Sequence, residues 1–174
     1  QDHPSVAITL ALQHQRSSAI RIGANVRASS QKGSADIHVL SLNETDESGM
    51  FGALIAGVMR VYSRGEVKYD SVTGTGIPVF NQLSDERDKE AMRDAVRFAY
   101  ALASSQSVSS IAGSLLSDAN GTSAQWIGDA TDIEIDDWAL RQVGAYSHAA
   151  GSCAMGNSRD AMAVVSERAE VIDY

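Results

Sequence analysis

One histidine lies in a segment that could support proton-transfer chemistry. His148 is followed, as far as Gly156, by the small-residue run Ala-Ala-Gly-Ser-Cys-Ala-Met-Gly. Glycine and small side chains let the backbone or a flat ligand come close to the imidazole. Because imidazole titrates near neutral pH, it can accept a proton from a substrate under working conditions. We therefore consider His148 the candidate catalytic base.

The same segment offers two alternative nucleophiles, and the surrounding pattern favours neither. Cys153 could form a thiolate pair with His148, but no third group that would orient the imidazole is evident. Ser152 could be a hydrolase nucleophile, but it is followed by Cys153 and Ala154. The second glycine of the G-x-S-x-G nucleophile elbow is therefore missing.

The remaining ligand-type residues predict no metal site. His3, His14 and His38 are not paired at i, i+4 with another ligand on a helix. Five acids fall within residues 129–137, but their spacing does not match a calcium loop of the EF-hand type, and the required glycine is absent. Cys153 is the only cysteine, which excludes an internal disulfide and a cysteine-rich zinc site.

Length and composition indicate one globular domain. The chain has 174 residues, of which 44% are hydrophobic and 21% charged. The net charge of −8 argues against nucleic acid and anionic membranes as partners, since like charges repel. The chain shows no signal-peptide pattern and no apolar stretch of the roughly 20 residues that span a bilayer. With the single cysteine, this favours the cytoplasm as the expected location.

The first eighty residues have the patterns of β-strands. Runs rich in β-branched residues, or alternating apolar and polar with period two, predict three strands. They are Ser5–Leu12, Ile20–Arg27 and Ile37–Leu42. Leu54–Tyr62 and Glu66–Tyr69 are expected to form a hairpin, in which Gly65 takes a positive φ at the turn. A loop is expected over Val72–Gly76.

The second half has helical periodicity. A helix is predicted from about Asp85 to about Ser104, with Ser84 as its N-cap and one apolar stripe. Ile111, Leu115 and Leu116 suggest a shorter helix, and the acids of residues 129–137 begin a helix of about three turns. Strands first and helices second predict an α+β fold, with helices packed on one face of an antiparallel sheet.

Five segments together resemble the glucose-methanol-choline (GMC) oxidoreductase family. They are Gln1–Pro4 (family L-Q-D-H-P), Ser63–Val67 (S-R-G-x-V), Leu83–Asp85 (a helix start), His148–Gly156 (H-P-x-G-T-C-x-M-G) and Ala163–Val165 (A-V-V-D). They follow the family's order and cover nearly the whole chain. Ala149 replaces the family's proline and Ser152 its threonine, and these two departures are mild; Ser166 stands where the family has an aspartate.

The resemblance implies a function and a mechanism. Family members bind FAD in a Rossmann-like domain and substrate over an antiparallel sheet of about six strands. A histidine takes the hydroxyl proton of an alcohol, and the flavin N5 accepts a hydride. By the motif match, His148 takes this histidine's place, so the chain resembles part of an FAD-dependent oxidoreductase acting on CH–OH groups. The alternative is a non-catalytic module that binds a small ligand, or an inactive fragment of such an enzyme.

The resemblance also implies what this chain lacks. Residues 1–174 correspond to one substrate-binding domain of a longer flavoprotein, and no Walker A pattern or G-x-G-x-x-G motif is present. The family's second catalytic residue, a histidine or asparagine, would follow Tyr174. The expected partners are a small alcohol and the FAD-binding domain of the same protein. We expect this chain alone to be inactive, to hold no FAD tightly, and to self-associate through its exposed domain interface.

Overall fold

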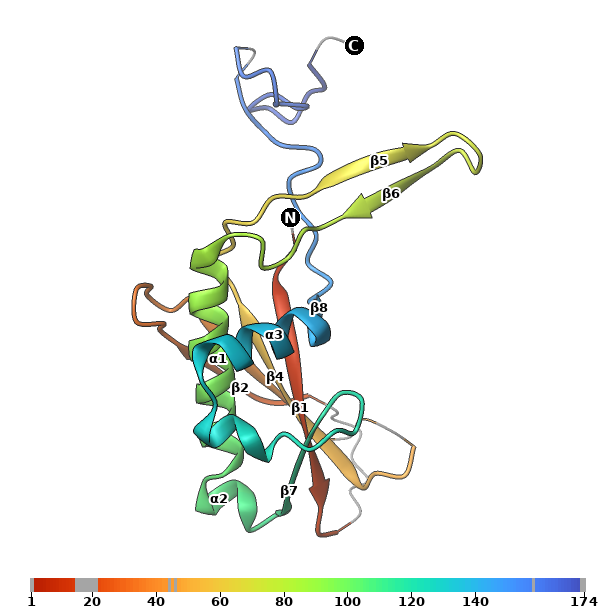
Figure 1. Cartoon of the computed structure of the whole chain (residues 1–174). Helices are drawn as coiled ribbons and strands as arrows, with labels where there is room; N and C mark the ends of the chain where they lie inside the picture. Colours follow the sequence, from red (N-terminus) through yellow and green to blue (C-terminus); the bar gives the residue numbers. More distant parts are fainter. Residues whose placement is uncertain (1, 15–21, 44, 46, 158, 173–174) are drawn as a thin grey trace.

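The main feature of the fold is a six-stranded antiparallel sheet. The computed structural model describes residues 2–14, 22–43, 45, 47–157 and 159–172. The strand order is β2-β3-β4-β1-β7, with β8 paired to β1 (Figure 1). The strands are β1 (Pro4–Leu12), β2 (Ile22–Ala28), β3 (Ile37–Leu42), β4 (Phe51–Val58), β7 (Ala112–Asp118) and β8 (Gly144–Ala145). The expected sheet of about six strands is therefore confirmed.

The two faces of the sheet differ in character because side chains alternate along each strand. One face is apolar and buried, as at Ile8, Val39 and Ala56. The opposite face, which we call the open face, is partly exposed. By the strand register, it carries Ala7, Thr9, Asn25, Arg27, His38, Leu40 and Ile55.

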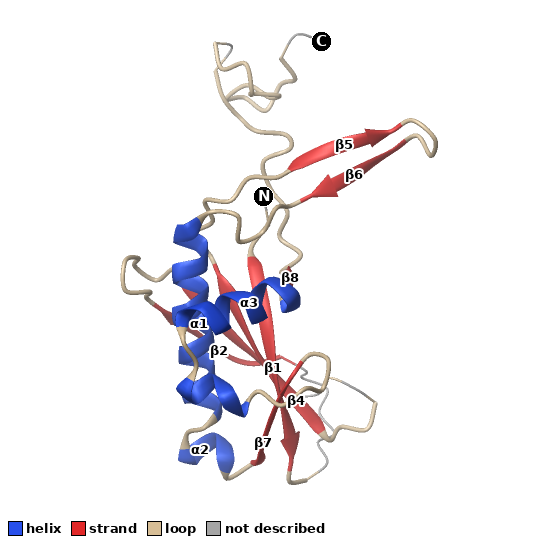
Figure 2. Ribbon diagram, viewed as in Figure 1, coloured by secondary structure: helices blue, strands red, loops and turns tan. Residues whose placement is uncertain are grey.

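Helices cover the buried face (Figure 2). The long helix α1 (Glu86–Ala103) packs on β1, β3 and β4. The short helix α2 (Gln106–Ser109) contacts β7, and α3 (Asp132–Gln142) packs on α1 together with the 3-10 helix η1 (Gln125–Asp129). Helix α3 begins with a capping box, in which Thr131 and Glu134 satisfy each other's backbone N–H groups. The predicted α+β architecture, with helices on one face, is confirmed.

The predicted short helix around Ile111–Leu116 is wrong, because that segment is strand β7. Its buried positions include Ala112, Leu116 and Asp118, which recur with period two. Asp118 can be buried at this position because its carboxylate accepts hydrogen bonds from the Trp138 and Gln142 side chains. Because the inward position 118 is a polar aspartate, the segment does not alternate between apolar and polar residues as a half-buried strand usually does. The N-cap of α1 is likewise Asp85 and not Ser84, since the Asp85 side chain accepts the Arg87 N–H.

The hairpin is formed by other strands than those predicted. β4 pairs with β1 and β3, while β5 (Glu66–Asp70) pairs with β6 (Thr75–Val79). The turn lies within the predicted loop, at Gly74, whose φ is +70°. Gly65 has no positive φ; a Cβ there would lie 2.1 Å from the Val79 carbonyl oxygen. Gly65 therefore serves the close approach of two backbones at the base of the hairpin.

A buried carboxylate joins the segment after β4 to α1. Asp88 lies in the first turn of α1 and is 0% exposed. Its side chain accepts the backbone N–H groups of Tyr62 (2.8 Å) and Ser63 (2.7 Å). No helix of the described part of the chain is long and apolar enough to cross a bilayer.

Candidate active site

The smallest strand brings His148 to the N-terminal end of β1. Gly144 and Ala145 of β8 pair with Ser5 and Pro4, and the Tyr146 N–H donates to the His3 carbonyl at 3.1 Å. The next residue, Ser147, has a φ of +64°, which is rare outside glycine. Such strain often accompanies functional positions. The following residue, His148, is exposed at the surface.

Asp2 fixes the backbone on both sides of this junction. Its carboxylate is 3% exposed, and one oxygen accepts the N–H of His3 at 2.7 Å and that of His148 at 3.0 Å. Hydrogen bonds to an ionised acceptor are stronger than those between neutral groups. The carboxylate thus holds the His148 backbone to a residue that lies at the opposite end of the sequence.

Two aromatic rings contact the His148 ring. The His148 ring meets the Tyr146 ring edge to face, with centroids 5.2 Å apart and planes at 78°. It meets the His3 ring at 5.8 Å and 90°. Edge-to-face contacts are a favoured geometry for aromatic pairs. His3 is itself held, because its Nδ1 lies 3.1 Å from the Val58 carbonyl oxygen.

A hydrogen-bonded chain continues from Tyr146 onto the open face. The Tyr146 hydroxyl lies 3.3 Å from His38 Nδ1, and His38 Nε2 lies 2.8 Å from the Asn25 side-chain oxygen. Because that oxygen can only accept, His38 donates through Nε2, and its Nδ1 accepts from Tyr146. The tyrosine ring packs over Gly57, where a Cβ would lie 3.4 Å from it, in van der Waals contact.

The surroundings of His38 favour its neutral form. Burial lowers the pKa of His38, and the nearby Arg27 guanidinium and His148 imidazole lower it further. Burial also raises the pKa of the Tyr146 hydroxyl, so both groups of this pair stay neutral near pH 7. The His38 ring must be neutral for its Nδ1 to accept a hydrogen bond from the Tyr146 hydroxyl.

We predict that the His38 ring titrates below its ordinary pKa of 6.5. Its ring-proton chemical shifts, followed by NMR from pH 4 to 8, would give the midpoint. Replacing Arg27 by Met should raise this midpoint, because one neighbouring positive charge is removed. A midpoint at or above 6.5 in the unmodified chain would contradict the arrangement described above.

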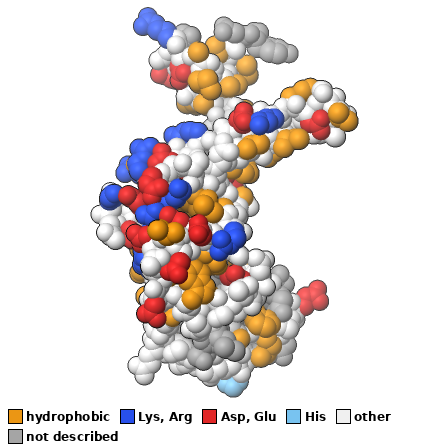
Figure 3. Space-filling model, viewed as in Figure 1, with side chains coloured by type: hydrophobic (Ala, Val, Ile, Leu, Met, Phe, Trp, Pro, Cys, Tyr) orange, Lys and Arg blue, Asp and Glu red, His pale blue; other side chains and the backbone are white. Residues whose placement is uncertain are grey.

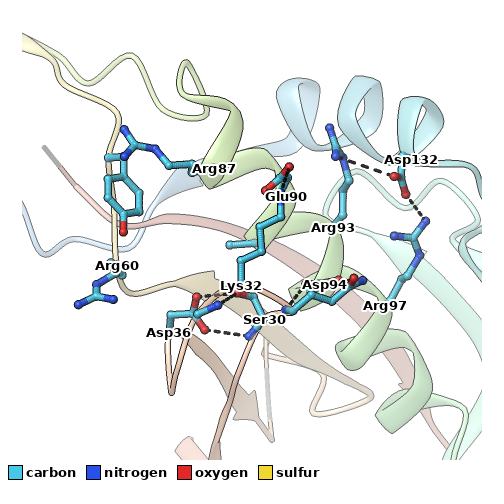
Figure 4. A pocket seen from close by; sticks show the side chains of 14 residues that line it. Ser30, Lys32, Asp36, Arg60, Arg87, Glu90, Arg93, Asp94, Arg97 and Asp132 are labelled. Atoms are coloured by element: carbon cyan, nitrogen blue, oxygen red, sulfur yellow. Dashed lines mark hydrogen bonds and ion pairs between the residues drawn. The ribbon is translucent and has the colours of Figure 1, made fainter.

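Two hollows lie away from His148. One, of about 310 Å³, lies on the helix side, and its charges are largely paired (Figure 4). Lys32 contacts Glu90 at 2.6 Å, and Arg97 contacts Asp132 at 2.8 Å. The other, of about 500 Å³, is mostly apolar and lies near Leu12, at the far end of β1 from His148. Within the described ranges, no three His, Cys, Asp or Glu side chains are grouped to hold a metal ion.

Comparison with known proteins identifies the family. A family model described as GMC oxidoreductase matches residues 61–174. The chain belongs to this family. The GMC match includes four of the five segments that carried the resemblance, among them Ser63–Val67 and His148–Gly156.

The GMC relatives include enzymes with named activities. Over 111 residues, 63% of this chain, it is 32% identical to oxygen-dependent choline dehydrogenase 1 of Chromohalobacter salexigens. It is 33% identical, over the same length, to oxygen-dependent choline dehydrogenase of Vibrio vulnificus. In each case the match spans only 19% of the relative's length.

Solved structures share the fold over nearly the whole chain. Pyridoxine 4-oxidase from "Mesorbium loti" matches with a TM-score of 0.76 and 20% identity, over 95% of this chain and 34% of that one. Formate oxidase from Aspergillus oryzae matches with a TM-score of 0.73 and 14% identity, over 98% and 39%. These structures support the GMC fold, with helices covering an antiparallel sheet.

The structure groups more residues around His148 than sequence analysis singled out. It brings His3, His38 and His148 together, whereas His14 lies beyond Leu12 at the other end of β1. Cys153 is exposed. The roles of Asp2 and Tyr146 were not predicted. The only signal for Asp2 was the resemblance of Gln1–Pro4 to a GMC segment, which lies outside the matched residues 61–174.

Proposed function

We propose that this chain is the substrate-binding domain of a longer FAD-dependent oxidoreductase acting on CH–OH groups, with His148 as the catalytic base. The GMC family to which the chain belongs is one of FAD-dependent oxidoreductases. The observation that carries the proposal is the position of His148: its imidazole is exposed next to the open face, while Asp2 holds its backbone. A base must be accessible to substrate and also fixed in place.

The residues around His148 suit proton removal next to a flat cofactor. The imidazole takes the hydroxyl proton of the alcohol, and the flavin, when bound, supplies the hydride acceptor. Ala149, Ala150 and Gly151 follow the base and are exposed, and Gly151 has a φ of +98°. Their small side chains allow a planar ring system to come close. The FAD-binding domain is a further part of the complete protein under this proposal.

Anaerobic flavin reduction tests the proposal. The complete protein should lose its visible flavin absorbance when an alcohol of the accepted class is added without oxygen. The present chain, mixed with FAD, should give no stoichiometric yellow complex. A flavin that stays oxidised with neutral, anionic and cationic primary alcohols alike would overturn the proposed activity.

Asp2 is a positioning residue under this proposal, and its replacement by Ala should slow flavin reduction about tenfold. The reason is that the His148 N–H loses the acceptor that fixes it. Asp2→Asn should restore most of the rate, because its amide oxygen still accepts a hydrogen bond. Stopped-flow measurements at saturating alcohol separate this rate effect from substrate binding.

A matched variant separates positioning from general stability. Asp36 is also a buried aspartate, and it accepts the backbone N–H and the hydroxyl of Ser30 on the helix side. Asp36→Ala should lower stability without slowing flavin reduction in the folded enzyme. Equal rate losses in the two alanine variants would count against a positioning role for Asp2.

A further inference from the structure

Acidic residues are absent from the strands that form the substrate side of the fold. The chain contains 22 Asp and Glu residues, yet β1, β2, β3 and β4 contain none. The ionisable side chains of these four strands are Arg27 and His38. The two residues are direct cross-strand partners, so both lie on the open face.

The carboxylates near the sheet are engaged elsewhere. Asp118 on β7 is buried on the helix side, where it binds Trp138 and Gln142. Asp2 is buried and accepts two backbone N–H groups. Acidic and basic side chains instead gather over α1 and α3 (Figure 3), where they form ion pairs such as Arg93 with Asp136. Among the described residues of the sheet strands, no carboxylate faces the open side.

Arg27 offers an exposed positive charge on the open face. It is exposed, and no carboxylate lies within ion-pair distance of it in the part of the chain that the structure describes. Its planar guanidinium presents a fork of donors that matches a carboxylate. From Arg27, the open face continues through His38 and Tyr146 to His148. Ring centroids along this row are 6.1 Å apart for His38–Tyr146 and 5.2 Å for Tyr146–His148.

We propose that the open face selects an alcohol carrying a carboxylate, with Arg27 binding the carboxylate while the hydroxyl lies at His148. This inference rests on the proposed function and names its substrate class. A cationic alcohol would find no carboxylate on the described strands and would approach the positive Arg27. Quaternary ammonium groups are typically bound by a cage of several aromatic rings. In this row, Tyr146 is the single aromatic ring besides the imidazoles, so such a cage is not formed there. The substrate class therefore differs from choline, the cation in the names of two relatives.

Two shape-matched alcohols of opposite charge test the selection in the complete flavoprotein. They are 4-(hydroxymethyl)benzoate and 4-(hydroxymethyl)-N,N,N-trimethylanilinium, compared with uncharged 4-methylbenzyl alcohol. The ratio of the flavin-reduction rate constant to the dissociation constant should be about tenfold or more higher for 4-(hydroxymethyl)benzoate than for the trimethylanilinium compound. Arg27→Met should weaken the binding of the carboxylate about 10- to 100-fold, a loss that exceeds any change seen with the uncharged alcohol. Arg141→Met removes an equal charge from α3 and should change neither the binding of the carboxylate nor that of the uncharged alcohol.

Calorimetric titration with 4-methylbenzoate, which has no hydroxyl, separates this inference from the proposed function. If no alcohol reduces the flavin but 4-methylbenzoate binds in an Arg27-dependent manner, the proposed activity fails and the anion site stands. If alcohols reduce the flavin but the trimethylanilinium compound reduces it at the same rate as 4-(hydroxymethyl)benzoate does, the inference is overturned and the activity stands. An unchanged carboxylate affinity in Arg27→Met, or no binding of 4-methylbenzoate, also overturns the inference.

Discussion

Replacement of His148 by Gln is expected to slow flavin reduction by alcohols at least about 100-fold, because a positioned base contributes roughly 10²–10⁴ to such a rate. Glutamine keeps a polar, planar end group but cannot accept a proton near neutral pH. The backbone N–H that donates to Asp2 is retained, so the loop should keep its conformation. Anaerobic stopped-flow absorbance with the complete flavoprotein measures the rate directly.

The matched control for this variant is His14→Gln. His14 lies beyond Leu12, at the end of β1 away from Pro4 and the His148 junction. Its replacement should leave both the flavin content and the reduction rate unchanged. A His148→Gln enzyme that is reduced at the unmodified rate, with full flavin content, would remove the base from the mechanism.

The largest expected loss of stability follows from Asp88→Ala. The substitution leaves the backbone N–H groups of Tyr62 and Ser63 without their acceptor, and Ser63 is buried. Each unsatisfied buried donor costs about 1–3 kcal/mol, so the free energy of unfolding should fall by about 3 kcal/mol. Alanine's better helix propensity offsets at most about 0.7 kcal/mol of this loss. Urea unfolding followed by circular dichroism gives the value.

Asp94→Ala is the matched control on the same helix. Asp94 accepts hydrogen bonds from Gln31 in an exposed setting, where water can replace the lost acceptor. Its removal should cost less than about 1 kcal/mol. Asp88→Asn should fall between the two, because its amide oxygen can still accept. Equal losses for Asp88→Ala and Asp94→Ala would show that the buried contact adds nothing beyond an exposed one.

The sequence predicted elements whose signals are local. Helix α1 was found because its apolar stripe and acidic first turn are encoded within one segment, and β3 was predicted with its observed bounds, Ile37–Leu42. The predicted strand Ile20–Arg27 became β2, although its first two residues lie outside the described part of the chain. Strand pairing was less accessible, because the partner of a strand is set by which apolar faces meet. The hairpin of β5 and β6 was therefore assigned to the wrong strands.

The candidate site shows the same division. His148 was predicted as the base from its motif and its small neighbours, whereas the residues that surround it come from distant segments. A strand of only two residues, β8, brings Tyr146 to His3, and such a short pairing has no sequence pattern of its own. The absence of acids from β1–β4 can be read in the sequence. Which side of the sheet carries Arg27 and His38 follows only from the strand register.

The hairpin of β5 and β6 projects from the body of the fold (Figure 1). Eight of its ten strand residues are exposed, and the other two, Asp70 and Val79, are partly buried. Val67, Tyr69 and Ile77 remain exposed on it. A two-stranded ribbon is marginally stable in water without a further surface to pack on. Its backbone amides should therefore exchange with solvent by local opening, while those of β1 and β4 exchange only when the whole domain unfolds. The order of this ribbon should therefore depend on whatever covers it in the longer protein proposed above.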